Sequence, residues 1–263
     1  MNKIDTKLQE IKERGRIGLM THVVVGYPSL PETISIVKAM AESGVDFVEL
    51  QIPFSDPLAD GTTIMKACEE SLTHGTKVKD AFTAMETLSS EVQIPLLFMA
   101  YYNTVFRYGV EKFCSDAKEA GASGLIIPDM PIDEEEQEGF YKYAKQYDLH
   151  TIQVLSPAST EERLLKNAEI ANGFVYCTAR QGTTGTKTEL DPTLVEYLNR
   201  VKKVISIPLA VGFGISKKEH IQSLNGTADI AVMGSALIEV VKNADQSSRI
   251  DAVKEFLQGL KVE

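Results

Sequence analysis

The feature of this sequence that most restricts its fold is a unit that recurs along the chain. Each unit has a short apolar segment, a loop containing glycine, proline, aspartate or asparagine, and then a helical segment with a polar face. The apolar segments are typical of strands because β-branched and aromatic residues are frequent in them. Eight of them begin at intervals of about thirty residues, and they span residues 19–25, 45–51, 95–101, 124–128, 151–155, 174–177, 207–212 and 230–234.

Strands that are apolar throughout and alternate with helices predict an α/β fold with a parallel sheet buried on both faces. Eight such units in 263 residues are the number that closes a (β/α)8 barrel, the TIM barrel. An open, doubly wound sheet is the alternative, and it would carry a GxGxxG fingerprint after its first strand. Gly26-Tyr27-Pro28 stands there instead. No linker divides the chain, so we expect residues 1–263 to form a single barrel domain.

A charged amphipathic segment, residues 2–14, precedes the first strand. Ile4, Leu8 and Ile11 recur at spacings of four and three, which places them on one face of an extra N-terminal helix. The segment does not resemble a secretory signal, and no apolar run approaches the roughly 20 residues that cross a bilayer. We therefore expect a cytoplasmic protein that does not use a membrane.

The net charge of −10 argues against nucleic acid and anionic membranes as partners. It does not exclude a phosphate ligand, because backbone amides at a helix N-terminus supply a local positive potential. The three cysteines show no CxxC spacing and indicate neither a disulfide framework nor a metal site. Asp129 and Asp133 are more typical of a helix N-terminus than of a metal site.

In a barrel, the loops that follow the strands carry the functional site. Residues 53–61, 102–108 and 179–188 are three of these loops. The third contains Gly182 and Gly185 among threonines, which indicates a hydroxyl-rich lid, with a disordered connector as the alternative.

Two carboxylates flank the first of these loops. Glu49 interrupts the apolar strand at 45–51, and Asp60 lies near the end of the loop at 53–61. This spacing allows the two acids to converge on one ligand. The alternative is a buried, satisfied glutamate together with an aspartate that caps the next helix.

Glycine turns follow the last two strands. Residues 211–216 read Val-Gly-Phe-Gly-Ile-Ser, and residues 232–236 run as Val-Met-Gly-Ser-Ala into a short helix. Glycines let the backbone approach a ligand, and the amides of Gly234, Ser235 and Ala236 would form a helix N-terminus. Phosphate sites of (β/α)8 barrels are frequently built from these loops and a short extra helix. Tight strand-to-helix turns without a ligand are the alternative.

Taken together, these stretches resemble the α subunit of tryptophan synthase along essentially the whole chain. The resemblance is most specific in residues 53–61, which read Pro-Phe-Ser-Asp-Pro-Leu-Ala-Asp-Gly. It is supported by residues 102–109, residues 128–131, Gly185, residues 212–216 and residues 234–236.

The resemblance implies a lyase of L-tryptophan biosynthesis that splits indole-3-glycerol phosphate into indole and glyceraldehyde 3-phosphate by a retro-aldol step. The matching positions carry two catalytic roles. Glu49 would protonate the indole ring at C3, and its apolar surroundings favour the protonated acid. Asp60 would remain ionised, bond the indole N–H and stabilise the positive charge that develops on the ring.

The resemblance also implies the residues that hold the substrate. Tyr176 would lie beside the glycerol phosphate, and Thr184 would hold Asp60 when the long loop closes. The phosphate contacts would be Gly185, Phe213, Gly214, Gly234 and Ser235. The indole wall would be shared among Met99, Tyr101, Ile126, Val154, Ile64 and Val232, each of which could instead serve only to pack the barrel.

A β subunit that uses pyridoxal phosphate is the partner that the resemblance implies, within an α2β2 heterotetramer. Pro53, Asp56, Asn103 and Pro131 lie in the loops that match the docking face. This chain itself should need no cofactor and no metal. Two alternatives remain: a chain that mainly activates the β subunit and catalyses weakly, or a barrel lyase acting on a different phosphorylated substrate.

Several residues beside the expected pocket depart from the family pattern. Gln51 stands where glycine is common, and His22 stands where phenylalanine is usual. Either these two bond one another or Glu49 in a buried network, or the pocket accepts a modified ligand. His74, His150 and His220 have no carboxylate partner identifiable in the sequence and are expected at the surface.

Overall fold

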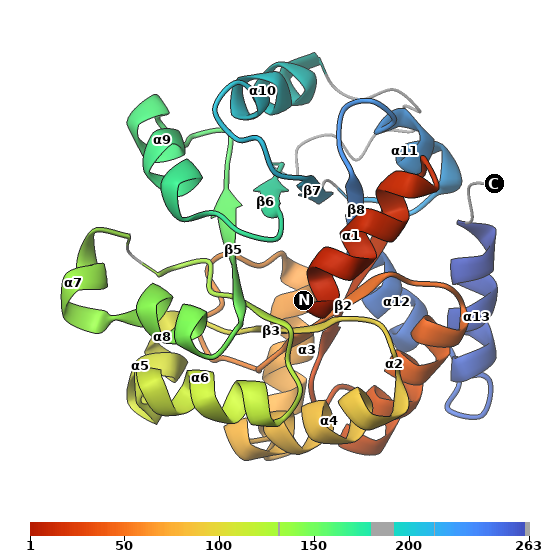
Figure 1. The fold of residues 1–263 in the computed structure, drawn as a ribbon. Coiled ribbons are helices and arrows are strands. Elements are labelled where there is room, and N and C mark those ends of the chain that lie inside the picture. The colour runs from red at the N-terminus through yellow and green to blue at the C-terminus, as the bar shows by residue number, and fades with distance from the viewer. Residues whose placement is uncertain (131, 180–191, 213, 261–263) are drawn as a thin grey trace.

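The computed structural model describes residues 1–130, 132–179, 192–212 and 214–260. Within them, parallel strands pair in sequence order, and the last pairs with the first to close a barrel. Figure 1 shows the helices arranged around these strands. The strands are β1 (Gly18–Val24), β2 (Phe47–Gln51), β3 (Leu96–Met99), β4 (Gly124–Ile126), β5 (His150–Leu155), β6 (Val175–Thr178), β7 (Leu209–Gly212) and β8 (Ile230–Met233).

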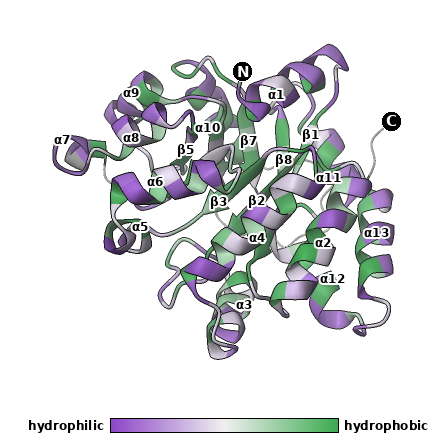
Figure 2. Cartoon of the chain, turned by 60° about the horizontal axis from the view of Figure 1, so that its bottom comes forward, coloured by the Kyte–Doolittle hydropathy of each residue, from purple (hydrophilic) through white to green (hydrophobic). Residues whose placement is uncertain are grey.

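The helices fill the intervals between the strands and surround the barrel. They are α1 (Lys3–Glu13), α2 (Leu30–Glu42), α3 (Thr62–Thr73), α4 (Val78–Glu91), α5 (Tyr102–Tyr108), α6 (Val110–Glu119), the 3-10 helix η1 (Ile132–Glu134), α7 (Glu135–Glu138), α8 (Phe140–Gln146), α9 (Glu161–Ile170), α10 (Pro192–Lys202), α11 (Lys218–Ser223), α12 (Ser235–Asn243) and α13 (Arg249–Gly259). Figure 2 shows apolar strands inside and helices whose polar residues face outward.

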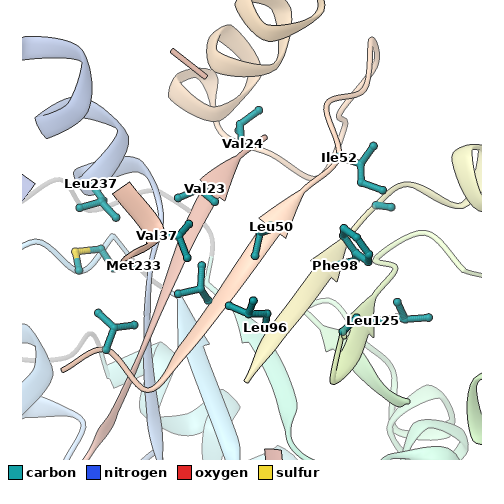
Figure 3. Close-up of a cluster of buried hydrophobic side chains, with 14 of the residues drawn as sticks. Val23, Val24, Val37, Leu50, Ile52, Leu96, Phe98, Leu125, Met233 and Leu237 are labelled. Carbon is teal, nitrogen blue, oxygen red and sulfur yellow. The ribbon is translucent and has the colours of Figure 1, made fainter. Parts of the chain in front are cut away.

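Alternation along the strands divides the buried side chains into two cores. Val48 and Leu50 of β2 face outward and pack in the layer between strands and helices, with Phe98 and Leu125 of the neighbouring strands. Figure 3 shows part of this layer, where Val37 of α2 and Leu237 of α12 approach the sheet. Residues of the opposite parity form a second cluster inside the barrel, and it includes Met20, Phe47, Leu97, Ile152 and Phe174.

Helix α1 covers the N-terminal end of the barrel. Its residues Ile4 and Ile11 are buried and belong to the interior cluster. A Cβ on Gly18 would lie only 2.6 Å from Ile11 Cδ1, and one on Gly124 would lie 3.0 Å from Ile4 Cδ1. The glycines let α1 pack closely against the strands, and at Gly124 the His150 backbone oxygen, 2.8 Å from an added Cβ, also leaves no room for a side chain. The interior is filled and closed at this end, which leaves the C-terminal end for a site.

The sequence predicted this architecture closely. The α/β class, the closed barrel, the N-terminal helix and all eight strands are confirmed, and every strand boundary lies within two residues of the prediction. The loop predicted at residues 102–108 is wrong, because these residues form α5. The carboxylate of Asp129 accepts the backbone N–H of Tyr102 at 2.8 Å and satisfies a donor at the start of this helix.

An ion pair between the buried Asp46 and the partly exposed Arg16 lies just before the first two strands. Both oxygens of Asp46 accept hydrogen bonds from the Arg16 guanidinium, at 2.6 and 2.7 Å, and Oδ2 also accepts the Leu19 backbone N–H at 2.9 Å. Asp46 is 2% exposed. Asp46→Ala would leave these donors without a partner, so we expect it to lower the free energy of unfolding by about 2–4 kcal/mol. Urea denaturation followed by circular dichroism measures this change.

The matched control is Glu42→Ala, which removes a carboxylate paired with Lys254 at 2.6 Å on the surface. Because exposed ion pairs contribute little, this variant should unfold at nearly the wild-type urea concentration. Equal midpoints for the two variants would show that the Asp46 contacts do not stabilise the barrel.

Candidate functional site

Glu49 lies inside the barrel, near the C-terminal end of β2. Its position follows from strand parity, because Phe47, Glu49 and Gln51 share the inward face. The β1–β2 register sets His22 opposite Glu49, and the β2–β3 register sets Leu97 opposite it on the other side. The Glu49 side chain is only 3% exposed. The carboxyl group is thus buried among strand residues, as the sequence indicated.

His22 is the direct partner of Glu49. Its Nδ1 lies 2.9 Å from Glu49 Oε1, and both side chains are buried. Burial lowers the pKa of His22, but the charges of Glu49 and Asp60, together with the hydrogen bond to Glu49, outweigh it and leave the pKa raised. The other nitrogen, Nε2, and the other carboxyl oxygen, Glu49 Oε2, have no partner among the described residues.

Asp60 is held by the side chains of Gln51, at the end of β2, and Tyr101, which lies between β3 and α5. Gln51 Nε2 donates to Asp60 Oδ2 at 2.6 Å, and the Tyr101 hydroxyl donates to the same oxygen at 3.0 Å. The Tyr101 oxygen in turn accepts the backbone N–H of Ala59 at 2.9 Å. Burial raises the pKa of Asp60, whereas His22 and the bonds from Gln51 and Tyr101 act in the opposite direction. Burial thus opposes the ionised form that the sequence led us to expect.

The predicted polar network is present, but one of its two residues has a hydrogen-bond partner other than the expected one. His22 bonds Glu49 as expected, but Gln51 bonds Asp60. The hydroxyl of Tyr101 was missed, because the sequence indicated only that its ring could contact indole. That ring stacks on Phe54, with centroids 5.1 Å apart. The signal that could have found the hydroxyl bond is the position of Tyr101 just beyond the C-terminal end of β3, beside the loop that carries Asp60.

The residues predicted to form the indole wall gather around the acids. Met99, Tyr101, Ile126 and Val232 belong to the interior cluster, and Val154 and Tyr176 pack against it. Ile64 comes from α3, and its Cδ1 would lie 3.4 Å from a Cβ on Gly234. The ring of Tyr176 lies over Gly212, where a Cβ would be 3.0 Å from the hydroxyl oxygen. Burial, and then the charges of Glu49 and Asp60, raise the pKa of Tyr176 well above its ordinary value.

The glycine turns lie at the C-terminal ends of β7 and β8. Gly214 has a φ of +83°, and none of the described residues lies within 4 Å of a Cβ added there, so the backbone conformation is what favours glycine. Gly234 precedes α12, and no side chain caps the helix that begins at Ser235. Backbone donors of this first turn are available to an anion. Thr184, Gly185, Phe213 and Pro131, and the predicted lid from residue 180 on, lie outside the described residues.

The predicted docking residues differ in accessibility. Asp56 and Asn103 are exposed, whereas Pro53 is buried. Three large apolar side chains are exposed in the segments that follow β2 and β3: Leu58 is 91% exposed, Phe106 56% and Met65 41%. Asp56 and Leu58 share one loop.

One prediction about the other histidines is wrong. His150 was expected at the surface without a carboxylate partner, but its Nε2 lies 2.8 Å from Asp5 Oδ1 and its Nδ1 lies 2.9 Å from Asn172 Oδ1. This pair joins α1 to β5 at the closed end of the barrel. The sequence does not reveal it because the two partners are 145 positions apart.

The described residues contain no group of three or more histidine, cysteine, aspartate or glutamate side chains arranged to hold a metal ion. Nor do they include a helix long and apolar enough to cross a membrane. What they do bring together is one buried carboxyl with a free oxygen, one carboxyl held by neutral donors, and an apolar lining. This arrangement can exchange a proton with an apolar ring system and stabilise a positive charge on it.

A closed parallel barrel with acids and glycine turns at the C-terminal ends of its strands is typical of (β/α)8-barrel enzymes. The profile of the tryptophan synthase alpha chain family matches residues 8–262. The chain belongs to that family.

Individual relatives agree with this assignment. The tryptophan synthase alpha chain of Desulfotalea psychrophila is 48% identical over 234 residues, which cover 89% of this chain and 91% of the relative. That of Caldanaerobacter subterraneus is 39% identical over 262 residues, 99% of each chain. Among solved structures, tryptophan synthase of Mycobacterium tuberculosis superposes with a TM-score of 0.89 at 32% identity, covering 98% of this chain and 96% of the other.

Proposed function

We propose that this chain, as a single barrel domain, cleaves indole-3-glycerol phosphate to indole and glyceraldehyde 3-phosphate as the α subunit of a tryptophan synthase. The observation that carries the proposal is the pair of acids at the barrel mouth. Glu49 is buried, with one oxygen unpaired in the described part of the chain, and Asp60 is oriented by Gln51 and Tyr101. Membership of the family gives the reaction, and the two acids provide the groups that it requires.

The two acids have different roles in the reaction. Glu49 gives a proton to C3 of the indole ring, which leaves a cationic ring able to accept the electrons of the adjacent carbon–carbon bond. As that bond breaks, the hydroxyl on the leaving carbon gives its proton back to the Glu49 carboxylate and becomes the aldehyde of glyceraldehyde 3-phosphate. Asp60 accepts the indole N–H and stabilises the positive charge on the ring. One proton enters and one leaves, so the reaction is balanced.

The remaining predicted residues bind the substrate in this proposal. Tyr176 contacts the glycerol phosphate side, Thr184 holds Asp60 in position, and the phosphate lies against Gly185, Phe213, Gly214, Gly234 and Ser235. The uncapped start of α12 supports this placement. The indole ring lies among Met99, Tyr101, Ile126, Val154, Ile64 and Val232. The chain needs no cofactor or metal of its own.

The same proposal includes a β subunit in an α2β2 assembly in the cytoplasm, with pyridoxal phosphate belonging to the β subunit. Asp56 and Asn103 would face it directly, with Pro131 in the neighbouring loop, while the buried Pro53 would shape the loop. The exposed Leu58, Met65 and Phe106 near the barrel mouth support an interface there.

Binding of indole-propanol phosphate, a non-cleavable substrate analogue, tests the site directly. The chain contains no tryptophan, so the indole emission belongs to the ligand alone. We expect saturable binding, with indole-propanol, which lacks the phosphate, binding at least about tenfold more weakly because it loses the charge-assisted hydrogen bonds. Equal affinity for the two ligands would contradict a phosphate site.

A second candidate function is activation of the β subunit with little cleavage by this chain. The hydrogen bond that occupies Glu49 Oε1 favours it, because a carboxyl engaged by His22 is less free to move. Cleavage rates measured with and without a β subunit separate the two. Measurable turnover of indole-3-glycerol phosphate in the assembled enzyme supports the lyase, and its absence alongside a faster β reaction supports the activator.

A further inference from the structure

The His22–Glu49 pair is a feature that the family reaction does not by itself explain. Its two side chains are 3% exposed each, and the two facing atoms are 2.9 Å apart. Each partner also keeps one buried polar atom without a partner among the described residues, Nε2 of His22 and Oε2 of Glu49. Leaving buried polar atoms unpaired costs free energy. Such atoms therefore indicate a place where a ligand binds or a proton is transferred.

We propose that His22 and Glu49 share one proton as a single unit, in which His22 is a positioning residue that occupies Glu49 Oε1 and leaves Oε2 for the reacting carbon. The inference rests on the proposed function. It adds a role for a residue that stands where the family pattern has phenylalanine.

The pair is suited to hold one proton. In one form, Nδ1 of the imidazolium donates to the Glu49 carboxylate, and in the other a protonated Glu49 bonds the neutral imidazole. Both forms have no net charge, which a buried site tolerates far better than a lone ion. The proton crosses a 2.9 Å hydrogen bond between them. The titration therefore belongs to the pair and not to either residue.

Cleavage leaves this unit unchanged. The shared proton moves to indole C3 as the O–H bond of Glu49 breaks and a C–H bond forms. The pair then receives the proton released by the glycerol hydroxyl as the carbon–carbon bond breaks and the aldehyde forms. His22 contacts the substrate at no step in this scheme, and it acts through Glu49.

Residues from several elements face the pair, and Gln51 of β2 is one of those that raise the pKa of His22. From the loop after β2, Asp60 adds a negative charge that favours the imidazolium. From β6 comes Tyr176, which stays neutral because burial and both carboxylates raise its pKa. Gly234, at the start of α12, lies close to the His22 ring, where a Cβ would be 3.7 Å from Cγ, and Ile64 of α3 lies beside it. Neither of these two residues carries a charge.

The first test is a carbon-13 NMR titration of the four histidines in the ligand-free chain. His22 is identified from His22→Asn or by elimination with the other histidines replaced singly. We expect Glu49→Gln to lower the pKa of His22 by about one unit or more, because the opposing carboxylate is lost and burial remains. A His22 titration that is the same in both chains overturns the proposal.

The second test is the pH profile of kcat/KM for His22→Asn, which keeps an N–H donor but cannot hold the proton. Two groups that share a proton release it at a higher pH than either alone. The alkaline limb should therefore move to lower pH by about one unit or more in this variant. His150→Asn is the matched control and should keep the wild-type profile. An unmoved alkaline limb in His22→Asn overturns the proposal.

These tests separate the inference from the function on which it rests. If the wild-type chain cleaves no indole-3-glycerol phosphate, with or without a β subunit, the proposed function fails. The NMR titration, which needs no substrate, still decides whether His22 and Glu49 form one unit. If the chain cleaves the substrate but His22 titrates independently of Glu49, only the inference fails.

Discussion

Glu49→Gln is expected to reduce cleavage of indole-3-glycerol phosphate by about a thousandfold, within the range that general acid catalysis contributes. Glutamine matches the shape of glutamate, and its Oε1 can still accept a hydrogen bond from His22. It has no carboxyl proton to give to indole C3. Steady-state release of indole by the purified chain, with and without a β subunit, measures the loss, and an unchanged urea midpoint shows that the fold is intact.

Glu42→Gln is the control for this variant. It makes the same chemical change on the surface of the barrel, where Glu42 pairs with Lys254. Its turnover should equal that of the wild type. Near-normal turnover in Glu49→Gln would remove this acid from the mechanism and require another proton donor for indole C3.

Asp60→Asn is expected to lower kcat by about 10²–10³-fold, the loss that follows removal of one preorganised electrostatic group. The amide oxygen of asparagine can still accept from Gln51 and Tyr101, so the loop should keep its position. The negative charge that stabilises the cationic ring is lost. The fall in kcat should exceed any change in the affinity for indole-propanol phosphate, because the charge matters most in the transition state.

Asp116→Asn is a matched control, because Asp116 also accepts a tyrosine hydroxyl, from Tyr108 at 2.5 Å, but on helix α6. It should leave kcat unchanged. If Asp60→Asn weakened binding of the analogue and cleavage by the same factor, Asp60 would be a binding group without a special role in the transition state.

The sequence predicted the barrel and the inward position of Glu49 because both follow from local patterns. Apolar strands at a regular interval set the fold, and strand parity turns Glu49 inward beside the loop that carries Asp60. The sequence also showed that His22 and Gln51 would be polar residues in an apolar interior. It could not assign their partners, because Gln51 reaches Asp60 only through the path of the loop at residues 53–61.

The errors share a physical cause, which is dependence on distant contacts. Residues 102–108 show no strong helical pattern, and their helix begins where Asp129, 27 positions away, accepts the Tyr102 N–H. His150 meets Asp5 only because α1 folds across the end of the barrel. Tyr101 has a ring that fits the predicted wall, and its hydroxyl finds Asp60 only once β2 and β3 lie side by side. Pairings of this kind are fixed by the closed fold.

Helix α1 also determines how molecules exchange with the interior. With Ile4 and Ile11 packed into one end, substrate can arrive and products can depart only by the rim where β2 and β3 finish. Substrate entry and product release therefore use the same opening. Any protein that covers this rim gains control over the escape of indole to the solvent, without touching a single group that takes part in the chemistry.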